Sequence, residues 1–129
     1  MTRRFPYDGT RSPAAPVLPV TFGRPGAPAR AAAVALVDSG AELSVLPERL
    51  ARSLRLPVLG EVTVQGVAGS RRARIYGAEL EINGMSLAIE VAGVGTHTLL
   101  GRDVLNRWTL VLRGPVGELE IATASERRG

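Results

Sequence analysis

An acidic residue, a hydroxyl and a glycine follow directly on an apolar run in the first half of the chain. The run from Val34 to Val37 is typical of a buried strand, and Asp38, Ser39 and Gly40 come next. Burying an unpaired charge is costly, so a buried strand ends in a carboxylate only where the chain turns outward or where the carboxylate serves chemistry. Asp38 therefore belongs either to an ordinary turn or to a site of acid–base chemistry.

Two other segments bear on this choice. The segment from Leu99 to Leu105 reads Leu-Leu-Gly-Arg-Asp-Val-Leu, which predicts a short apolar strand leading into a short helix. Taken alone, it could simply begin a helix with both charges in solvent. Between this segment and Asp38, the strand-like stretches 61–65 and 71–76 flank a glycine-bounded tip, which predicts a β-hairpin. Alone, that tip would be a plain loop.

In this order, and in a chain of 129 residues, the segments resemble the retropepsin-like aspartic proteases. That family carries Asp, then Thr or Ser, then Gly, and later two apolar residues before Gly-Arg-Asp or Gly-Arg-Asn. The resemblance implies that Asp38 is the catalytic carboxylate and that Ser39 hydrogen-bonds across a dimer. It further implies that Gly40 leaves room for backbone N–H groups and substrate, and that Ala41 is small where substrate passes.

The resemblance also makes the glycine-bounded hairpin a flap that opens and closes over substrate. The flap and substrate-binding residues would be Gln65, Gly66, Val67, Ala68 and Gly69. Glu42 stands where many family members have Asp, and we expect a partly buried ion pair between Glu42 and Arg102 that joins loop to helix. The returning arm of the hairpin is unusually basic, with Arg71, Arg72 and Arg74. This feature indicates either a solvated strand edge or a preference for acidic substrates.

An aspartic protease of this type uses two carboxylates that share one proton. This chain has one Asp-Ser-Gly, because Asp8 is followed by Gly-Thr and Asp103 belongs to the other motif. We therefore expect a homodimer that brings two copies of Asp38 together, and peptide-bond hydrolysis by an activated water. The resemblance implies no metal or organic cofactor, and a peptide or protein substrate.

The order of strands, turns and short helices predicts an all-β, barrel-like domain, which the resemblance makes a retropepsin-like acid-protease barrel with a flap hairpin and one or two short helices. Asn83-Gly84 between two alternating runs is the strongest hairpin signal. We expect a flexible N-terminal arm over residues 1–16, the protease domain over 17–123, and a frayed tail over 124–129.

Composition narrows the function further. The net charge of +4 comes from arginines that are scattered, with few aromatic residues, so we expect no nucleic-acid partner. Without cysteine the chain has no thiol nucleophile, and the single His97 predicts no metal site. We expect a cytoplasmic protein without a transmembrane segment. The alternatives are a non-catalytic dimeric β-domain for peptide binding or assembly and, more remotely, a basic nucleic-acid-binding module.

Overall fold

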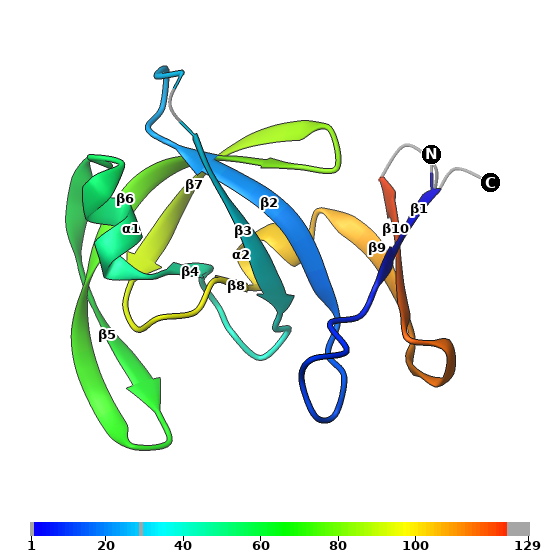
Figure 1. Cartoon of the computed structure of the whole chain (residues 1–129). Helices are drawn as coiled ribbons and strands as arrows, with labels where there is room; N and C mark the ends of the chain where they lie inside the picture. The colour runs from blue at the N-terminus through cyan, green and yellow to red at the C-terminus, as the bar shows by residue number, and fades with distance from the viewer. Residues whose placement is uncertain (1, 29, 124–129) are drawn as a thin grey trace.

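The computed structural model describes residues 2–28 and 30–123 of the chain. Within these residues, strands predominate and the helices are short (Figure 1). The strands are β1 Thr2–Pro6, β2 Val17–Gly23, β3 Arg30–Val37, β4 Val45–Leu46, β5 Val58–Gly66, β6 Gly69–Ile82, β7 Met85–Gly93, β8 Leu99–Leu100, β9 Trp108–Arg113 and β10 Glu118–Thr123. The helices are α1 Glu48–Ser53, α2 Arg102–Leu105 and the 3₁₀-helix η1 Gly114–Val116. No helix among the described residues has the length and hydropathy needed to cross a membrane.

Seven strands form one sheet that closes on itself. Their order is β2-β3-β8-β4-β7-β6-β5, and β2 also pairs with β6, so the sheet becomes a barrel. The barrel encloses a single large cluster of apolar side chains in which Leu18, Phe22, Leu80 and Leu100 are fully buried. This architecture confirms the expected all-β, retropepsin-like barrel with short helices.

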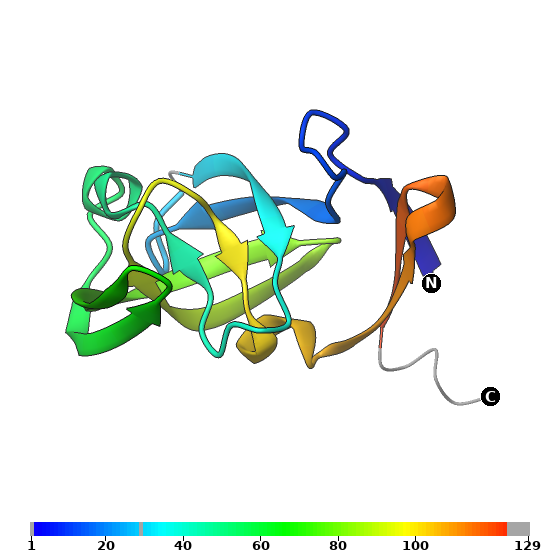
Figure 2. The same cartoon turned by 90° about the horizontal axis from the view of Figure 1, so that it is seen from below.

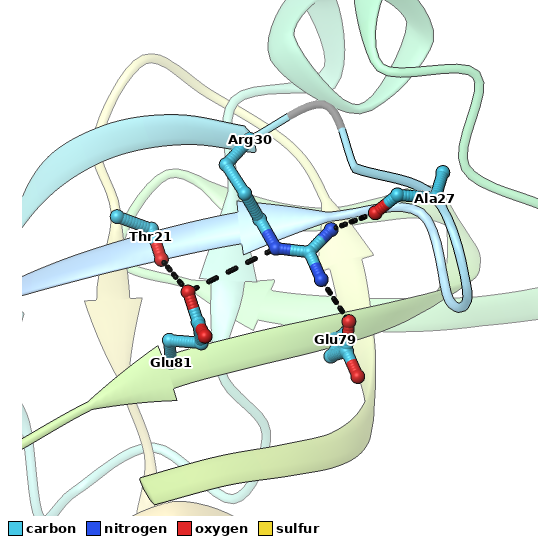
Figure 3. Close-up of polar contacts among 5 residues, drawn as sticks. All are labelled: Thr21, Ala27, Arg30, Glu79 and Glu81. Carbon is cyan, nitrogen blue, oxygen red and sulfur yellow. Dashed lines mark hydrogen bonds and ion pairs between the residues drawn. The ribbon is translucent and has the colours of Figure 1, made fainter. Parts of the chain in front are cut away.

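The seam that closes the barrel is held by a polar cluster as well as by strand pairing (Figure 3). Arg30 in β3 reaches over β2 to ion-pair with Glu79 and, at 3.9 Å, with Glu81, both in β6. The Thr21 hydroxyl donates to the same Glu81 carboxylate at 3.0 Å, and Arg30 donates to the Ala27 carbonyl at 2.6 Å. Because these charges are partly solvated, the cluster fixes the register of the seam more than it adds stability.

A second sheet, ordered β1-β10-β9, stands at one end of the barrel and joins the two ends of the chain (Figure 2). The pairing of Phe5 with Leu119 and of Arg4 with Glu120 corrects the expectation of a loose arm over residues 1–16. The edge strand β1 pairs with a partner more than a hundred residues away, and Phe5 packs against the core. The expected tail over 124–129 lies outside the described residues.

Local turn chemistry fixes the hairpins where the sequence indicates them. Asn83 and Gly84 both have positive φ, 50° and 76°, as the tight β6–β7 hairpin requires. Strand β6 is longer than expected, because the returning arm of the first hairpin and the opening arm of the second are one continuous strand of 14 residues. This strand runs from the barrel into the first hairpin, so it connects the core to the flap directly.

Tyr76 in β6 links the barrel to α1. Its side chain is almost fully buried, and its hydroxyl donates to the Glu48 carboxylate at 2.8 Å. The tyrosine ring packs over Gly93, where a side chain would collide: a Cβ there would lie 2.6 Å from ring atom Cε2. A glycine at 93 is therefore required by close packing and not by a special backbone angle.

Replacing Gly93 by alanine is expected to destabilise the protein by about 1–3 kcal/mol, because Tyr76 must leave its rotamer or the backbone must shift. The free energy of unfolding, measured in urea at one fixed protein concentration, tests this. Gly60→Ala is the matched control, since a Cβ at Gly60 has no neighbour within 4 Å. Equal stability of the two variants would contradict the packing argument.

Burial, together with the hydrogen bond to Glu48, raises the pKa of the Tyr76 hydroxyl above its ordinary value of 10.0. Tyrosine is neutral below its pKa, so the stability from this shift is present below pH 10 and is lost as the pH rises through the folded-state pKa. In an absorbance titration near 295 nm, the step that Tyr76→Phe removes should lie above the ordinary value. If the step that Tyr76→Phe removes lies at or below 10.0, the Tyr76 hydroxyl is not held as described.

Candidate active site

Asp38 lies just past the end of β3, where the chain leaves the sheet. Its N–H donates to the carbonyl of Leu100 in the neighbouring strand β8 at 3.0 Å, which extends the parallel β3–β8 pairing by one residue. Its carboxylate Oδ1 accepts the N–H of Gly40 at 3.0 Å, and the Ala41 N–H donates to the Asp38 carbonyl at 3.2 Å. The turn holds the half-exposed carboxylate in one orientation, with Ser39 and Gly40 exposed beside it.

Gly40 matters here because of space. A Cβ at this position would lie 3.2 Å from Oδ1 of Asp38, tighter than ordinary van der Waals contact. The Gly40 N–H donates to the same oxygen at 3.0 Å. The expected role of Gly40 in leaving room for substrate stays a prediction. The small Ala41 follows, half-buried, at the point where the loop turns toward α2.

The loop that carries Asp38 is attached to the start of α2 through the backbone. The Arg102 N–H donates to the Ala41 carbonyl at 2.8 Å, and the Asp103 N–H donates to the Glu42 carbonyl at 3.3 Å. Gly101 makes this approach possible, since a Cβ there would lie 2.8 Å from the carbonyl carbon and oxygen of Leu43. Any larger residue would push loop and helix apart.

A buried polar network, which sequence reasoning missed, completes the attachment. Ser44 is fully buried, and its hydroxyl donates to Oδ1 of Asp103 at 2.9 Å while it accepts the Gly101 N–H at 3.0 Å. The Ser44 N–H donates to Oδ2 of Asp103 at 3.2 Å, and the Val104 N–H donates to Oδ1 at 3.0 Å. The available signal was a serine inside the apolar stretch from Leu43 to Leu46, where a hydroxyl needs a buried partner.

The structure corrects one expectation about this region. Among the described residues, no ion pair joins Glu42 to Arg102, and both side chains are exposed. The Arg102 guanidinium instead donates to the Ser39 carbonyl at 2.7 Å, because the helix start places it beside the turn and not beside Glu42. Loop and helix are thus joined as expected, but by Asp103 and a backbone carbonyl.

The expected flap is an antiparallel hairpin formed by β5 and β6, which extends from the barrel (Figure 1). Gln65 pairs with Ser70 and Gly66 with Gly69, whose φ is +117°. Val67 and Ala68 form the exposed tip. Among the described residues, no hydrogen bond or ion pair ties this tip to the loop that carries Asp38, so the structure does not join the flap residues to the carboxylate.

The comparison with protein families decides the identity. A family model described as "gag-polyprotein putative aspartyl protease" matches residues 29–107, which include the Asp38 loop, the flap hairpin and α2. The chain belongs to this family. By family and fold it is an aspartic protease of the retropepsin-like type. No curated protein matched the chain significantly.

Solved structures show the same fold at low sequence identity. A retropepsin-like aspartic protease from Rickettsia conorii is 16% identical over 93% of this chain and 98% of its own, with a TM-score of 0.63. The EIAV protease, solved with the inhibitor HBY-793, is 23% identical over 71% of this chain and 86% of its own, with a TM-score of 0.56. The retroviral protease-like domain of Ddi1 from Leishmania major is 21% identical over 89% and 98%, with a TM-score of 0.52.

In this family member, the sheet around Asp38 has two apolar faces. Cross-strand partners share a face, so the register connects side chains across six strands, β3, β8, β4, β7, β6 and β5. One face points into the barrel core and includes Ala35, Leu46 and Leu100, all fully buried. The opposite face, which we call the apolar face, consists of Leu36, Leu99, Val45, Ala92, Ile75, Ala73, Val62 and Val64.

The apolar face runs from the end of β3, next to Asp38, to the flap. Ala92, Ile75 and Ala73 are buried, while the remaining members, such as Leu36 and Val64, are only half-buried. The apolar face is thus an apolar surface that extends from the Asp38 carboxylate to the hairpin. Sequence reasoning missed it because alternation within one strand does not tell which strands lie side by side.

No group of three or more histidine or acidic side chains in the described residues could hold a metal ion. His97 is exposed, in the loop between β7 and β8. The donors that surround Asp38 are backbone N–H groups, which suit a carboxylate and not a cation.

Replacing Ser44 by alanine is expected to cost about 1–3 kcal/mol of stability, because the Gly101 N–H and the Asp103 carboxylate then lose a buried partner. Urea unfolding measures the cost, and the amide exchange rate of Gly101 should rise with it. Ser53→Ala is the control, since the exposed Ser53 hydroxyl donates to the Leu50 carbonyl within α1. Similar losses in both variants would contradict a special role for the Ser44 network.

Proposed function

We propose that the protein is an endopeptidase that works as a homodimer, in which the two Asp38 carboxylates activate one water between them. The single observation that carries the proposal is the Asp38 turn: a carboxylate oriented by the Gly40 N–H, half-exposed, and held on a loop that is firmly attached to α2. A carboxylate held this way is ready for proton transfer but needs a second one.

The second carboxylate has to come from another copy. Asp103, which is attached to this loop through Ser44, already accepts hydrogen bonds from the Ser44 hydroxyl and from two backbone N–H groups. Glu42 is exposed and lies outside the turn formed by Asp38, Ser39 and Gly40. Ser39 and Gly40 are exposed, so the turn is accessible to the identical turn of a second copy. A two-fold axis near Ser39 then brings the two Asp38 carboxylates into one shared site.

In the proposed site, one Asp38 is charged and its mate carries the proton, because two like charges so close do not both ionise. The charged carboxylate takes a proton from water as the water oxygen attacks the peptide carbonyl carbon. The protonated one donates to the carbonyl oxygen. Collapse of the tetrahedral intermediate breaks the C–N bond, and the amine leaves with a proton from the dyad.

Substrate binding in this proposal uses the apolar face and the flap. An extended peptide that lies between the Asp38 loop and the β5–β6 hairpin would add strand-like hydrogen bonds, while every second side chain contacts residues such as Leu36, Val45 and Leu99. Ala41 is small at the edge of this path, and Gly66 and Gly69 give the hairpin freedom to close over the peptide.

Asp38→Asn is expected to abolish cleavage of a proteome-derived peptide mixture between pH 4 and 7, read by mass spectrometry. The asparagine is isosteric, so fold and assembly are retained while the acid–base group is lost. Sedimentation of the variant as a species of the same size as wild type is the control for assembly. Equal cleavage by both proteins would rule out Asp38 as the catalyst, and an inert, dimeric, peptide-binding wild type would favour a non-catalytic binding domain.

Mixing distinguishes one shared site from two separate ones. When an equal amount of Asp38→Asn is added to a fixed amount of wild type and subunits exchange, mixed dimers have one carboxylate only. If the dyad is shared, the total activity falls to about half, since half of the wild-type chains enter inactive pairs. Unchanged activity after exchange would contradict a shared dyad.

A further inference from the structure

The two faces of the flap hairpin carry different charges. Pairing within β5–β6 puts Glu61 with Arg74, Thr63 with Arg72 and Gln65 with Ser70 on the side opposite the apolar face. We call this side the outer face of the hairpin. The outer arginines have partners there: Arg72 ion-pairs with Glu61, and Arg74 lies 3.7 Å from Glu48 of α1. The outer face of the hairpin is therefore a set of compensated charges beside α1.

Arg71 lies on the other face. It pairs with Val64, and the next pair toward the barrel on that side is Ala73 with Val62, so Arg71 extends the apolar face toward the flap tip. Its side chain is exposed, and within the described part of the chain it makes no hydrogen bond, ion pair or cation–π contact. Arg71 is therefore an exposed cation without a partner among the described residues, at the flap end of the apolar face.

We propose that Arg71 is a specificity-determining residue that pairs with an aspartate or glutamate side chain of the bound peptide. This inference rests on the proposed function. A guanidinium next to valines loses water when a peptide covers it, and this loss is compensated best by a carboxylate that accepts two of its N–H donors. A neutral or basic side chain at the same place would leave the cation desolvated and unpaired.

The two-fold symmetry of the proposed dimer sharpens the inference. Side chains of an extended peptide alternate in direction, so only every second residue meets the apolar face of a given flap. Each subunit contributes one Arg71, and the two lie on opposite sides of the scissile bond. Acidic residues should therefore be preferred at two positions, one before and one after the cut.

The test compares cleavage-site profiles of a proteome-derived peptide library for wild type, Arg71→Ala, Arg71→Glu and Arg72→Ala. Wild type should favour Asp or Glu over Gln at one position on each side of the cut by about tenfold in kcat/KM, as expected for a close charge pair. Arg71→Ala should lose this preference while it still cuts neutral peptides. Arg71→Glu should reverse it toward Lys or Arg.

Arg72→Ala is the matched control, because it removes the same charge from the adjacent position on the outer face and should keep the acidic preference. A wild type that cuts without acidic preference, or an equal loss in Arg71→Ala and Arg72→Ala, would overturn the role of Arg71 and leave the proposed hydrolysis intact.

A binding measurement separates this inference from the proposed reaction. The same library is passed over immobilised Asp38→Asn protein and over the double variant Asp38→Asn/Arg71→Glu, and the retained peptides are identified. Acidic enrichment on the first surface that disappears on the second supports recognition by Arg71, even where wild type fails to cut. Without such enrichment, and without cleavage, both the recognition and the hydrolysis are wrong.

Discussion

The close approach between Gly101 and the Leu43 carbonyl is the contact on which the geometry of the site depends. It joins two pieces of backbone, so no side-chain rotation can relieve or replace it, and it leaves no room for a Cβ on residue 101. The hydroxyl of Ser44 then links the Gly101 N–H to the Asp103 carboxylate in a buried environment, where hydrogen bonds are strong and missing partners are costly. The loop that carries Asp38 is thus held in place by rigid contacts, and the Gly40 N–H then orients the carboxylate on that loop.

A sheet with two apolar faces follows from the same arrangement. The short strands β4 and β8 are surrounded by longer ones, so each of their residues points either into the core or onto the apolar face. Val45 and Leu99 are half-buried on that second face although core positions exist on the first. Half-buried apolar side chains that gather next to a carboxylate indicate a surface that a bound molecule covers.

The sequence predicts those features that depend on neighbours along the chain. The Asp38 turn, the Asn83–Gly84 hairpin and the helix after Gly101 all follow from local residue types. Features set by distant partners do not follow from local residue types. The pairing of β1 with β10 was missed, and the partner expected for Arg102 was wrong, because its guanidinium donates to the Ser39 carbonyl. A position shared with a family does not say which way a side chain points, so the resemblance predicted a Glu42–Arg102 pair that the fold does not form.

The half-exposure of Asp38 has an energetic consequence for the proposed dimer. A single chain folds without burying this charge, and so avoids the largest cost that such a site could impose. That cost arises at assembly, when two carboxylates meet and lose water together. A proton shared between them removes one of the two charges, so assembly of the site and its correct protonation become one event. In the proposed dimer, folding and activation are thereby separate events: the single chain forms the barrel and its loop, and the chemistry requires the second copy.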